Sequence, residues 1–485
     1  MDRRNFIKAT AATAAVTATG LTTATPAGAA EEGRAPNLLV IMTDQQNFRT
    51  VGRHRALLSS EQAHLWGKGN IVRTPNIDRL ALRGVLASNF YSTSPICSPA
   101  RAAFMTGTYT PRNRVLRNDD PMVDGVSTFA EPLRAAGYAT GYAGKWHLEG
   151  DAKPGWKPAR TWGFDDRRHM FNRGHDKKVI DTPNGPRMGA DGAIGDGESY
   201  MTDWLTDKTL DFIDEHSERP FCYMVSYPDP HTPLRVREPY RSMYADMDFT
   251  LPRTAGRNAD GKPKWAQPKQ KRFNMSNYYG MISLIDDSIG RIMERLKSHR
   301  LLRHTIVVFC ADHGEMAMEH SRVGKTTPYE SAAKVPFIVR APRLIQRNAV
   351  IDDVMAGVDV APTLLDIMGV RPDGVVDGRS AKRLFTEGTA PSNWNDVAML
   401  RGYGNDGWVA AVDRRHKLVF TKDAEPWLLD RDADPDELRN FYKDAAYRGV
   451  RRDLATATID YASDHNEPLF KRVASAQDQL KAAAR

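Results

Sequence analysis

Cysteine is scarce in this chain, and long apolar runs are missing. Its 485 residues include three cysteines, which is too few for a small scaffold held together by disulfides. Mean hydropathy is negative, and no apolar run is long enough to predict a polytopic membrane protein. The combined Gly and Pro content is ordinary, which excludes collagen-like and wholly disordered chains. Internal repeats of about 20 to 50 residues are also missing, so neither a solenoid nor a propeller is expected.

The first 29 residues are predicted to be an export signal outside the fold. Arg3 and Arg4 precede a weakly apolar Ala/Thr stretch, and the small residues at 27–29 suit signal cleavage. This pattern resembles a twin-arginine signal, which is read by a translocase that exports folded proteins. Its removal takes away three basic and one acidic side chain, so the net charge falls from +8 to +6. We expect a periplasmic or secreted protein, with the twin-arginine translocase as a partner and no stable membrane anchor.

The basic balance favours anionic partners without specifying which. Lys and Arg are densest at 262–272, a segment that we interpret as a solvated loop. The sequence shows no helix-turn-helix, zinc-finger or aromatic RNA-binding pattern, so no nucleic-acid partner is expected.

Short apolar runs alternate with helix-length periodic segments, a pattern typical of α/β folds. It predicts a mostly parallel sheet covered by helices on both faces, and a covering helix at 277–296. After about Arg371 the segments shorten, and the alternation over 408–420 predicts antiparallel strands. We therefore expect an α/β domain at 36–370 and a smaller C-terminal antiparallel-sheet subdomain at 371–485, closed by a helix near 475–484. An irregular insertion is expected at 235–272. The predicted strands of the main sheet are 37–43, 139–143, 220–227, 305–311 and 335–340.

Polar side chains come directly after four of these predicted strands, at the edge where open α/β sheets bind ligands. They are Asp44 and Gln45, Lys145 and His147, His231, and Asp312 with His313. A single Asp after a strand is usually a turn former or helix cap. Two of them at one edge favour a site for Ca²⁺, Mg²⁺ or Mn²⁺, completed by the amide oxygen and the imidazole.

The segment 94–107 predicts a short helix with Pro99 in its first turn and Gly107 after its end. Cys97 would lie just before the positive end of this helix, where an anion is stabilised. Considered alone, Cys97 is either a buried structural thiol or a thiolate nucleophile. Cys222 and Cys310 lie inside apolar strands and are expected to be inert core thiols.

With these residues assembled, the chain resembles the sulfatase family of the alkaline-phosphatase-like superfamily. The pattern Cys97-x-Pro99-x-Arg101, followed by Thr106-Gly107, is similar to the signature in which the cysteine becomes formylglycine, also called 3-oxoalanine. Family-like segments continue in order from about 36 to 440: PNLLVIMTDQ, TPNIDRLALRG, GYATGYAGKWHL, TIVVFCADHGE and GKTTPYESAAKVPFIV. The resemblance implies an alkaline-phosphatase-like fold, with 36–370 as the catalytic domain, and a formylglycine-generating enzyme as a partner.

The resemblance also implies a role for each matching residue. Cys97, as formylglycine, would be the nucleophile, and Arg101 would hold it in place. The implied catalytic residues are Cys97, Arg101, Lys145, His147, His231 and Lys325. The implied metal ligands are Asp44, Gln45, Cys97, Asp312 and His313.

Three positions depart from the frequent family pattern. Many relatives carry a second Asp at the position of Gln45, some carry Asn at the position of His313, and Ala100 replaces a frequent Ser. Because of the first two changes, the family pattern alone does not decide between Ca²⁺ and Mn²⁺. Ca²⁺ is the first expectation, with Mn²⁺ and Mg²⁺ as alternatives.

The implied activity is hydrolysis of organic sulfate monoesters, small molecules or glycans, with release of inorganic sulfate. One hydroxyl of the hydrated aldehyde would attack sulfur, and the other would later expel sulfate. The metal, Lys145 and Lys325 would stabilise the developing charge. His231 or Lys325 would protonate the leaving alkoxide, and His147 would accept a proton during elimination.

Two other functions are weighed against this one. A phosphonate monoester or phosphodiester hydrolase of the same superfamily can share the nucleophile and often the Asp-Gln pattern. A secreted binding module with a decayed site is the second, and it is disfavoured because the main site residues are all present.

Overall fold

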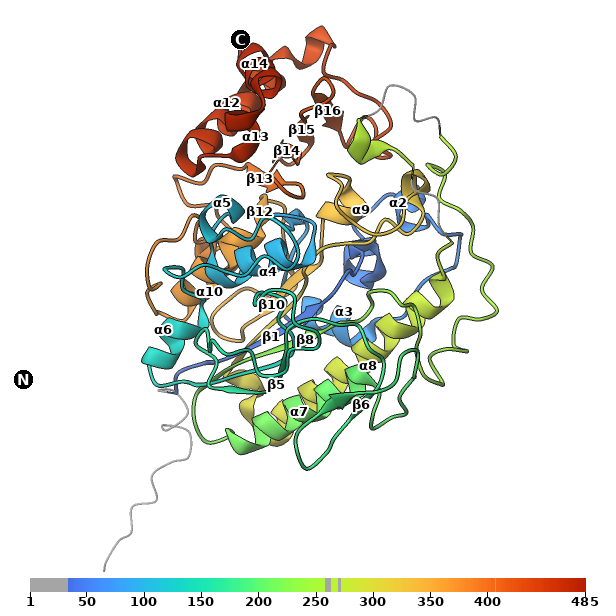
Figure 1. The fold of residues 1–485 in the computed structure, drawn as a ribbon, viewed down its shortest axis with the longest axis vertical. Helices are drawn as coiled ribbons and strands as arrows, with labels where there is room; N and C mark the ends of the chain where they lie inside the picture. The colour runs from blue at the N-terminus through green and yellow to red at the C-terminus, as the bar shows by residue number, and fades with distance from the viewer. Residues whose placement is uncertain (1–33, 258–262, 269–271, 406) are drawn as a thin grey trace, which may run out of the picture. The chain divides into compact units, whose positions relative to one another are not determined.

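A mostly parallel, eight-stranded sheet organises the fold shown in Figure 1. The computed structural model describes residues 34–257, 263–268, 272–405 and 407–485, so the predicted signal at 1–29 lies outside the described residues. The strand order is β11-β2-β10-β9-β1-β8-β4-β5, and β10 runs antiparallel to both of its neighbours. The strands are β1 (Asn37–Thr43), β2 (Val85–Ala87), β4 (Ala139–Lys145), β5 (Asp166–Phe171), β8 (Phe221–Tyr227), β9 (Thr305–Ala311), β10 (Phe337–Arg340) and β11 (Ala349–Ile351).

All five strands predicted for the main sheet are confirmed, and the sequence missed β2, β5 and β11. The three missed strands lie towards the two edges of the sheet. Every residue of β1, β8 and β9 is buried, because these strands are covered on both faces. Within β1, Leu38, Val40 and Met42 pack into one core, and Leu39 and Ile41 pack into another, as the two-residue period of a strand requires.

Helices cover both faces of the sheet (Figure 1). One face packs against α3 (Pro75–Leu82), α7 (Met201–Glu215) and α8 (Met275–Ser298), and α8 contains the predicted helix 277–296. The other packs against α4 (Cys97–Thr106), α6 (Ala130–Ala135) and α10 (Val360–Ile367). None of the helices in the described ranges combines the length and apolarity that a membrane span needs.

The C-terminal region forms a separate antiparallel sheet, as predicted. Its strands are arranged in order as β13 (Ala398–Arg401), β14 (Val409–Val412), β15 (His416–Phe420) and β16 (Trp427–Asp430). One face of this sheet packs against α12 (Arg448–His465), α13 (Pro468–Arg472) and α14 (Ala474–Ala483). Helix α14 matches the closing helix predicted near 475–484. The domain boundary at 370 and 371 stays a prediction.

Short elements connect these layers. Within the described part of 235–272, the structure contains turns and one 3-10 helix, η2 (Lys264–Ala266), which agrees with the expected irregular insertion. The remaining α-helices and strands of the described residues are α1 (Gly52–Arg55), α2 (Ser60–Ala63), α5 (Thr110–Asn113), α9 (Glu330–Ala333), α11 (Lys382–Thr386), β3 (Phe90–Tyr91), β6 (Val179–Ile180), β7 (Arg187–Met188) and β12 (Met355–Ala356).

A buried ion pair joins the C-terminal sheet to its helices. The guanidinium of Arg401 on β13 donates to the carboxylate of Glu467, at 3.0 Å from Nη2 to Oε1. Glu467 also accepts from the hydroxyl of Tyr461 at 3.0 Å and from the backbone N–H of Leu469 at 3.1 Å, which caps α13. The Arg401 and Glu467 side chains are only 2% and 0% exposed.

We expect Glu467→Ala to lower the free energy of unfolding by about 3–5 kcal/mol, because it leaves a buried guanidinium without its counter-ion. Thermal unfolding followed by circular dichroism measures the loss. The control is Glu387→Ala, which removes an exposed pair with Arg383 and should cost at most about 1 kcal/mol. Equal shifts in the two variants would contradict this account of the pair.

Candidate active site

The carboxyl ends of four adjacent strands bring the predicted polar residues together. Asp44 comes directly after β1, Lys145 ends β4, and Asp312 comes directly after β9; all three are buried. The strands β9, β1, β8 and β4 are consecutive neighbours in the sheet, so residues that come after them in the sequence lie close in space. The polar residues therefore gather at the predicted edge of the sheet.

Arg101 connects the two carboxylates. Its Nη2 lies 2.9 Å from Asp312 Oδ2 and 3.3 Å from Asp44 Oδ2. Its Nη1 donates to Ser226 Oγ at 2.6 Å and to the Lys145 carbonyl at 2.7 Å. Burial and the neighbouring Asp44 raise the pKa of Asp312. Burial acts in the same direction on Asp44, but Lys145, His231, His175 and Lys325 together outweigh it and hold the pKa of Asp44 well below its usual range.

Cys97 faces these carboxylates from the start of α4. It is the first residue of that helix, whereas the sequence analysis predicted that it lies just before the helix. Gly107 follows the last helical residue, as predicted, with a left-handed φ of 67°. Cys97 and Arg101 are four residues apart and therefore share one face of α4. Cys97 Sγ lies 3.7 Å from Asp44 Oδ1. It also lies 3.3 Å from His313 Nε2 and 3.0 Å from Lys325 Nζ.

The surroundings of Cys97 are strongly cationic. Burial and Asp44 act to raise the pKa of its thiol, but Lys145, Lys325 and His313 together hold that pKa well below its ordinary value. For Cys222 and Cys310, burial instead raises the thiol pKa, as expected for inert core thiols. Of the three cysteines, the structure thus favours a negatively charged group at position 97.

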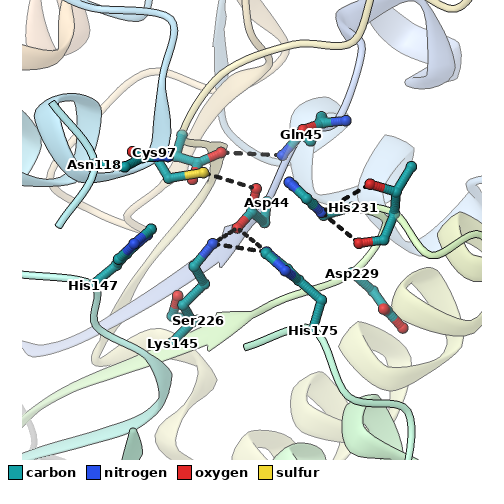
Figure 2. Close-up of polar contacts among 12 residues, drawn as sticks. Asp44, Gln45, Cys97, Asn118, Lys145, His147, His175, Ser226, Asp229 and His231 are labelled. Atoms are coloured by element: carbon teal, nitrogen blue, oxygen red, sulfur yellow. Dashed lines mark hydrogen bonds and ion pairs between the residues drawn. The ribbon is translucent and has the colours of Figure 1, made fainter. Parts of the chain in front are cut away.

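Lys145 contacts Asp44 together with a histidine that the sequence analysis missed. Its Nζ donates to Asp44 Oδ2 at 2.6 Å and to His175 Nε2 at 2.8 Å. The His175 ring stacks on His231 with centroids 3.6 Å apart. Figure 2 shows Lys145 and His175 reaching Asp44 from one side and Cys97 from the other. Burial and Lys145 lower the pKa of His175 to about 3, so this ring is neutral and accepts from the ammonium.

His231 presents one ring nitrogen to the site. Its Nδ1 donates to the Thr232 carbonyl at 2.6 Å, which leaves Nε2 as an acceptor. Its pKa is lowered well below the ordinary value, first by burial and then by His175 and Lys325.

His147 lies apart from this network in Figure 2. Its Nε2 is 2.9 Å from Asp119 Oδ1, and its backbone has the unusual φ of 64°. Within the described residues, no hydrogen bond or ion pair joins it to Cys97, Asp44 or Lys145. Asp119 was also missed by the sequence analysis. So was Asn118, whose side chain accepts from the backbone N–H of Ser98 at 3.1 Å.

Lys325 reaches the site from a loop after β9. Its Nζ donates to Gln45 Oε1 at 2.8 Å, and Cys97 Sγ is 3.0 Å away. The next residue, Thr326, has a left-handed φ of 75°, which is strained for a β-branched residue. Its N–H donates to the Pro95 carbonyl at 3.0 Å, and its carbonyl accepts from the Trp408 indole N–H at 3.0 Å. The C-terminal region therefore helps to hold the loop that carries Lys325.

The residues around Asp44 fit a divalent cation. Asp44, Cys97, Asp312 and His313 each offer a ligand atom, and these atoms lie within 4.8 Å of one another. His313 Nδ1 donates to the Gly314 carbonyl at 3.0 Å, so in the neutral ring the lone pair of Nε2 would face Asp44 Oδ1 and Asp312 Oδ1, which are 3.6 and 3.5 Å away. Acceptors that face one another in this way need a cation between them.

In a second group of three, Asp44, His175 and His231, the ligand atoms also lie within 4.8 Å of one another. The Lys145 ammonium already contacts Asp44 and His175. A side-chain cation therefore neutralises this second group, and the first group is the better candidate for a metal.

The fold is alkaline-phosphatase-like. A structure solved in complex with its substrate D-glucosamine-2-N,6-O-disulfate aligns with a TM-score of 0.75 at 21% identity, covering 89% of this chain and 98% of the other. A phosphonate monoester hydrolase of Agrobacterium radiobacter aligns with a TM-score of 0.72 at 24% identity, covering 89% and 96%.

The chain belongs to the sulfatase family and is a sulfatase-family enzyme. The Sulfatase family model matches residues 36–370, and the model for the C-terminal part of N-sulphoglucosamine sulphohydrolase matches 318–463. The uncharacterized sulfatase YidJ of Escherichia coli K12 is 27% identical over 90% of this chain and 88% of its own length. The N-acetylglucosamine-6-O-sulfatase of Bacteroides thetaiotaomicron is 24% identical over 87% and 86%. A twin-arginine translocation signal matches residues 1–20, which confirms the predicted export route.

We expect Arg101→Met to lower the midpoint of thermal unfolding, and to lower it more in a chelator than in excess Ca²⁺. The variant leaves two buried carboxylates without their shared guanidinium, at a cost of about 3–5 kcal/mol, and a bound divalent cation would offset part of that cost. Differential scanning calorimetry under the two conditions measures the difference.

Arg340→Met is the matched control for this prediction. Arg340 is a buried arginine on β10 that donates to the Leu302 carbonyl, so its loss should not depend on Ca²⁺. A loss in Arg101→Met that is the same with and without Ca²⁺ would contradict the proposed neutralisation.

Proposed function

We propose that this enzyme hydrolyses sulfate monoesters of organic alcohols and releases inorganic sulfate, with Cys97 converted to formylglycine. The observation that carries the proposal is the placement of residue 97 at a helix start, 3.0 Å from the Lys325 ammonium and facing Asp44 and His313. An anionic group at this position would be surrounded by fixed positive charge.

The modified residue and the metal supply two kinds of chemistry. Hydrated formylglycine supplies one hydroxyl for attack on sulfur and a second for the later release of sulfate. A divalent cation, held by Asp44, Gln45, Asp312 and His313, would polarise oxygen ligands. Ca²⁺ is the proposed ion because the donor set is dominated by oxygen.

The remaining groups bind the ester and move protons. Lys145 at the end of β4 and Lys325 in the loop after β9 would hold the non-bridging oxygens of sulfate. Lys325 is also placed to donate a proton to the leaving alkoxide, because its ammonium is a donor only. The free Nε2 of His231 is an acceptor, so it would accept a proton or a hydrogen bond. For His147, paired with Asp119, we propose the role of base during release of sulfate.

A cavity beside His175 would take the alcohol part of the substrate. Its volume is about 480 Å³, which is in the range of small-molecule sites, and Lys153, Asp176, Asp191 and Arg235 contribute charged groups to its wall. Such a lining suits a hydroxylated, charged alcohol better than an apolar one. A sulfated sugar is therefore the proposed substrate class, and the Bacteroides relative named as an N-acetylglucosamine-6-O-sulfatase supports it.

Parallel assays on an aryl sulfate, an aryl phosphonate monoester and a phosphodiester test the reaction class. We expect the highest kcat/KM on the sulfate. All three non-bridging oxygens of a sulfate ester can face cations, whereas the phosphorus substrates place a carbon or an esterified oxygen at one of these positions. A higher kcat/KM on either phosphorus substrate would instead establish the alternative function, a phosphonate monoester or phosphodiester hydrolase.

Cys97→Ser tests the need for two hydroxyls on one carbon. A serine can attack sulfur, but it has no second hydroxyl with which to expel sulfate, so we expect one equivalent of alcohol per enzyme and then no turnover. Rapid-quench kinetics measure the burst, and mass spectrometry locates the retained sulfate on the protein.

Cys222→Ala, which changes a core thiol on β8, is the control and should turn over repeatedly. Sustained turnover by Cys97→Ser would rule out the formylglycine mechanism.

A further inference from the structure

Glu315 is a fully buried carboxylate behind the candidate metal site. It lies after β9, three residues beyond Asp312. Its Oε2 accepts a short hydrogen bond from Gln45 Nε2. Its Oε1 accepts from the backbone N–H of Ala317 at 2.9 Å and of Gly324 at 2.5 Å. In the described part of the chain, no Lys, Arg or His forms an ion pair with Glu315. Burial raises the pKa of Glu315, but the three N–H groups that donate to its oxygens favour the ionised form.

The contact with Gln45 decides which end of that amide faces the site. A glutamine side chain has a donor end and an acceptor end of almost the same shape. Because Nε2 is bound to Glu315, Oε1 faces inward, where it accepts from Lys325 Nζ at 2.8 Å. The reverse orientation would bring an NH₂ group against an ammonium and towards a cation site.

The backbone of Gln45 is fixed as well. Its N–H donates to Asp312 Oδ1 at 3.1 Å, and its carbonyl accepts from the Tyr278 hydroxyl at 2.8 Å. Its φ of 68° is left-handed, a conformation that persists only when surrounding contacts hold it. With the backbone of the residue held, Glu315 on the NH₂ group and Lys325 on the oxygen set the orientation of the amide. Among the described residues, Glu315 is the hydrogen-bond partner of that NH₂ group.

Glu315 also closes the loop that leads to Lys325. The two N–H groups bound by its Oε1 belong to residues on opposite sides of this loop, and Met316 N–H donates to the Gly324 carbonyl at 2.8 Å. One carboxylate thus fixes a candidate metal ligand and the segment that carries a candidate sulfate-binding lysine.

We propose that Glu315 is a positioning residue, which orients the Gln45 amide with its oxygen towards the metal and Lys325. The inference rests on the proposed function for its effect on turnover. It explains how a neutral glutamine serves where many relatives have a charged ligand, because the amide oxygen is held in place by a carboxylate one hydrogen bond behind it. Partners of this kind typically change metal affinity or activity about 10- to 100-fold when they are removed.

An isosteric exchange of the two side chains tests the proposal. Glu315→Gln keeps the oxygen that accepts from Ala317 and Gly324, but it sets one NH₂ group against another at Gln45. Gln45→Glu sets one carboxylate against another. The double variant Gln45→Glu/Glu315→Gln restores one donor and one acceptor and keeps the total charge. We expect each single variant to lower kcat/KM on an aryl sulfate about 10- to 100-fold, and the double variant to recover to within a few fold of the parent.

Binding of Ca²⁺ to the full-length, metal-free protein, measured by calorimetry, is the second readout. Glu315→Gln should bind Ca²⁺ about 10- to 100-fold more weakly, and the double variant should recover. This readout does not depend on turnover. If the parent enzyme failed to hydrolyse sulfate esters, the proposed function would be overturned, but the effect of Glu315 and Gln45 on Ca²⁺ affinity could still be measured. Thermal unfolding shows that each variant is folded.

Glu319→Gln provides the matched control. Glu319 is another buried glutamate of the same segment, but its partners are Arg49 and Ser331. Combining it with Gln45→Glu should give no recovery. The proposal is overturned if the fold-loss in kcat/KM of the Gln45→Glu/Glu315→Gln double variant equals the product of the two single-variant losses. It is also overturned if adding Glu319→Gln to Gln45→Glu restores kcat/KM as well as adding Glu315→Gln does.

Discussion

Two buried carboxylates, Asp44 and Asp312, must be neutralised at the ends of adjacent strands, and the rest of the site is arranged around that requirement. Two carboxylates this close and this deep would not both ionise without cations nearby. Arg101 contacts both, Lys145 contacts Asp44, and His313 Nε2 faces both carboxylates. The guanidinium and the ammonium neutralise one side of the cluster. In the proposed function a divalent cation lies on the side facing Cys97, which would tie the position of residue 97 to that of the metal.

The fold supplies this arrangement through strands that are covered on both faces. Apolar packing fixes β1, β8 and β9 in register, so the groups at their carboxyl ends are held by the core and not by mobile loops. Helix α4 packs on the same sheet and brings Cys97 and Arg101 to it on one helical face. The C-terminal region contributes at a distance, because the Trp408 indole binds the strained Thr326 peptide beside Lys325. The contacts that pack these strands and α4 together therefore also hold the side chains of the site in position.

The features that depend on local patterns could be predicted from the sequence. The apolar runs indicated the five central strands, and the polar residues after them indicated Asp44, Lys145, Asp312 and His313. Strand β5 was missed, because its residues Asp166 to His169 are polar at the sheet edge, and with it His175 in the next loop. A histidine shortly after the apolar pair Met170-Phe171 was the available signal. The role of Glu315 could not be predicted, since its neighbours Gln45 and Gly324 come from separate segments. The contact of His147 with Asp119 likewise depends on a tertiary fold that no spacing encodes.

The central claim is that residue 97 is an aldehyde-derived nucleophile held in a cationic, metal-binding pocket. Mass spectrometry of the tryptic peptide 84–101 from the exported, active enzyme tests it most directly. The account predicts formylglycine at position 97, in a fraction that rises and falls with specific activity across preparations. Fully active enzyme with an unmodified cysteine at this position would contradict it.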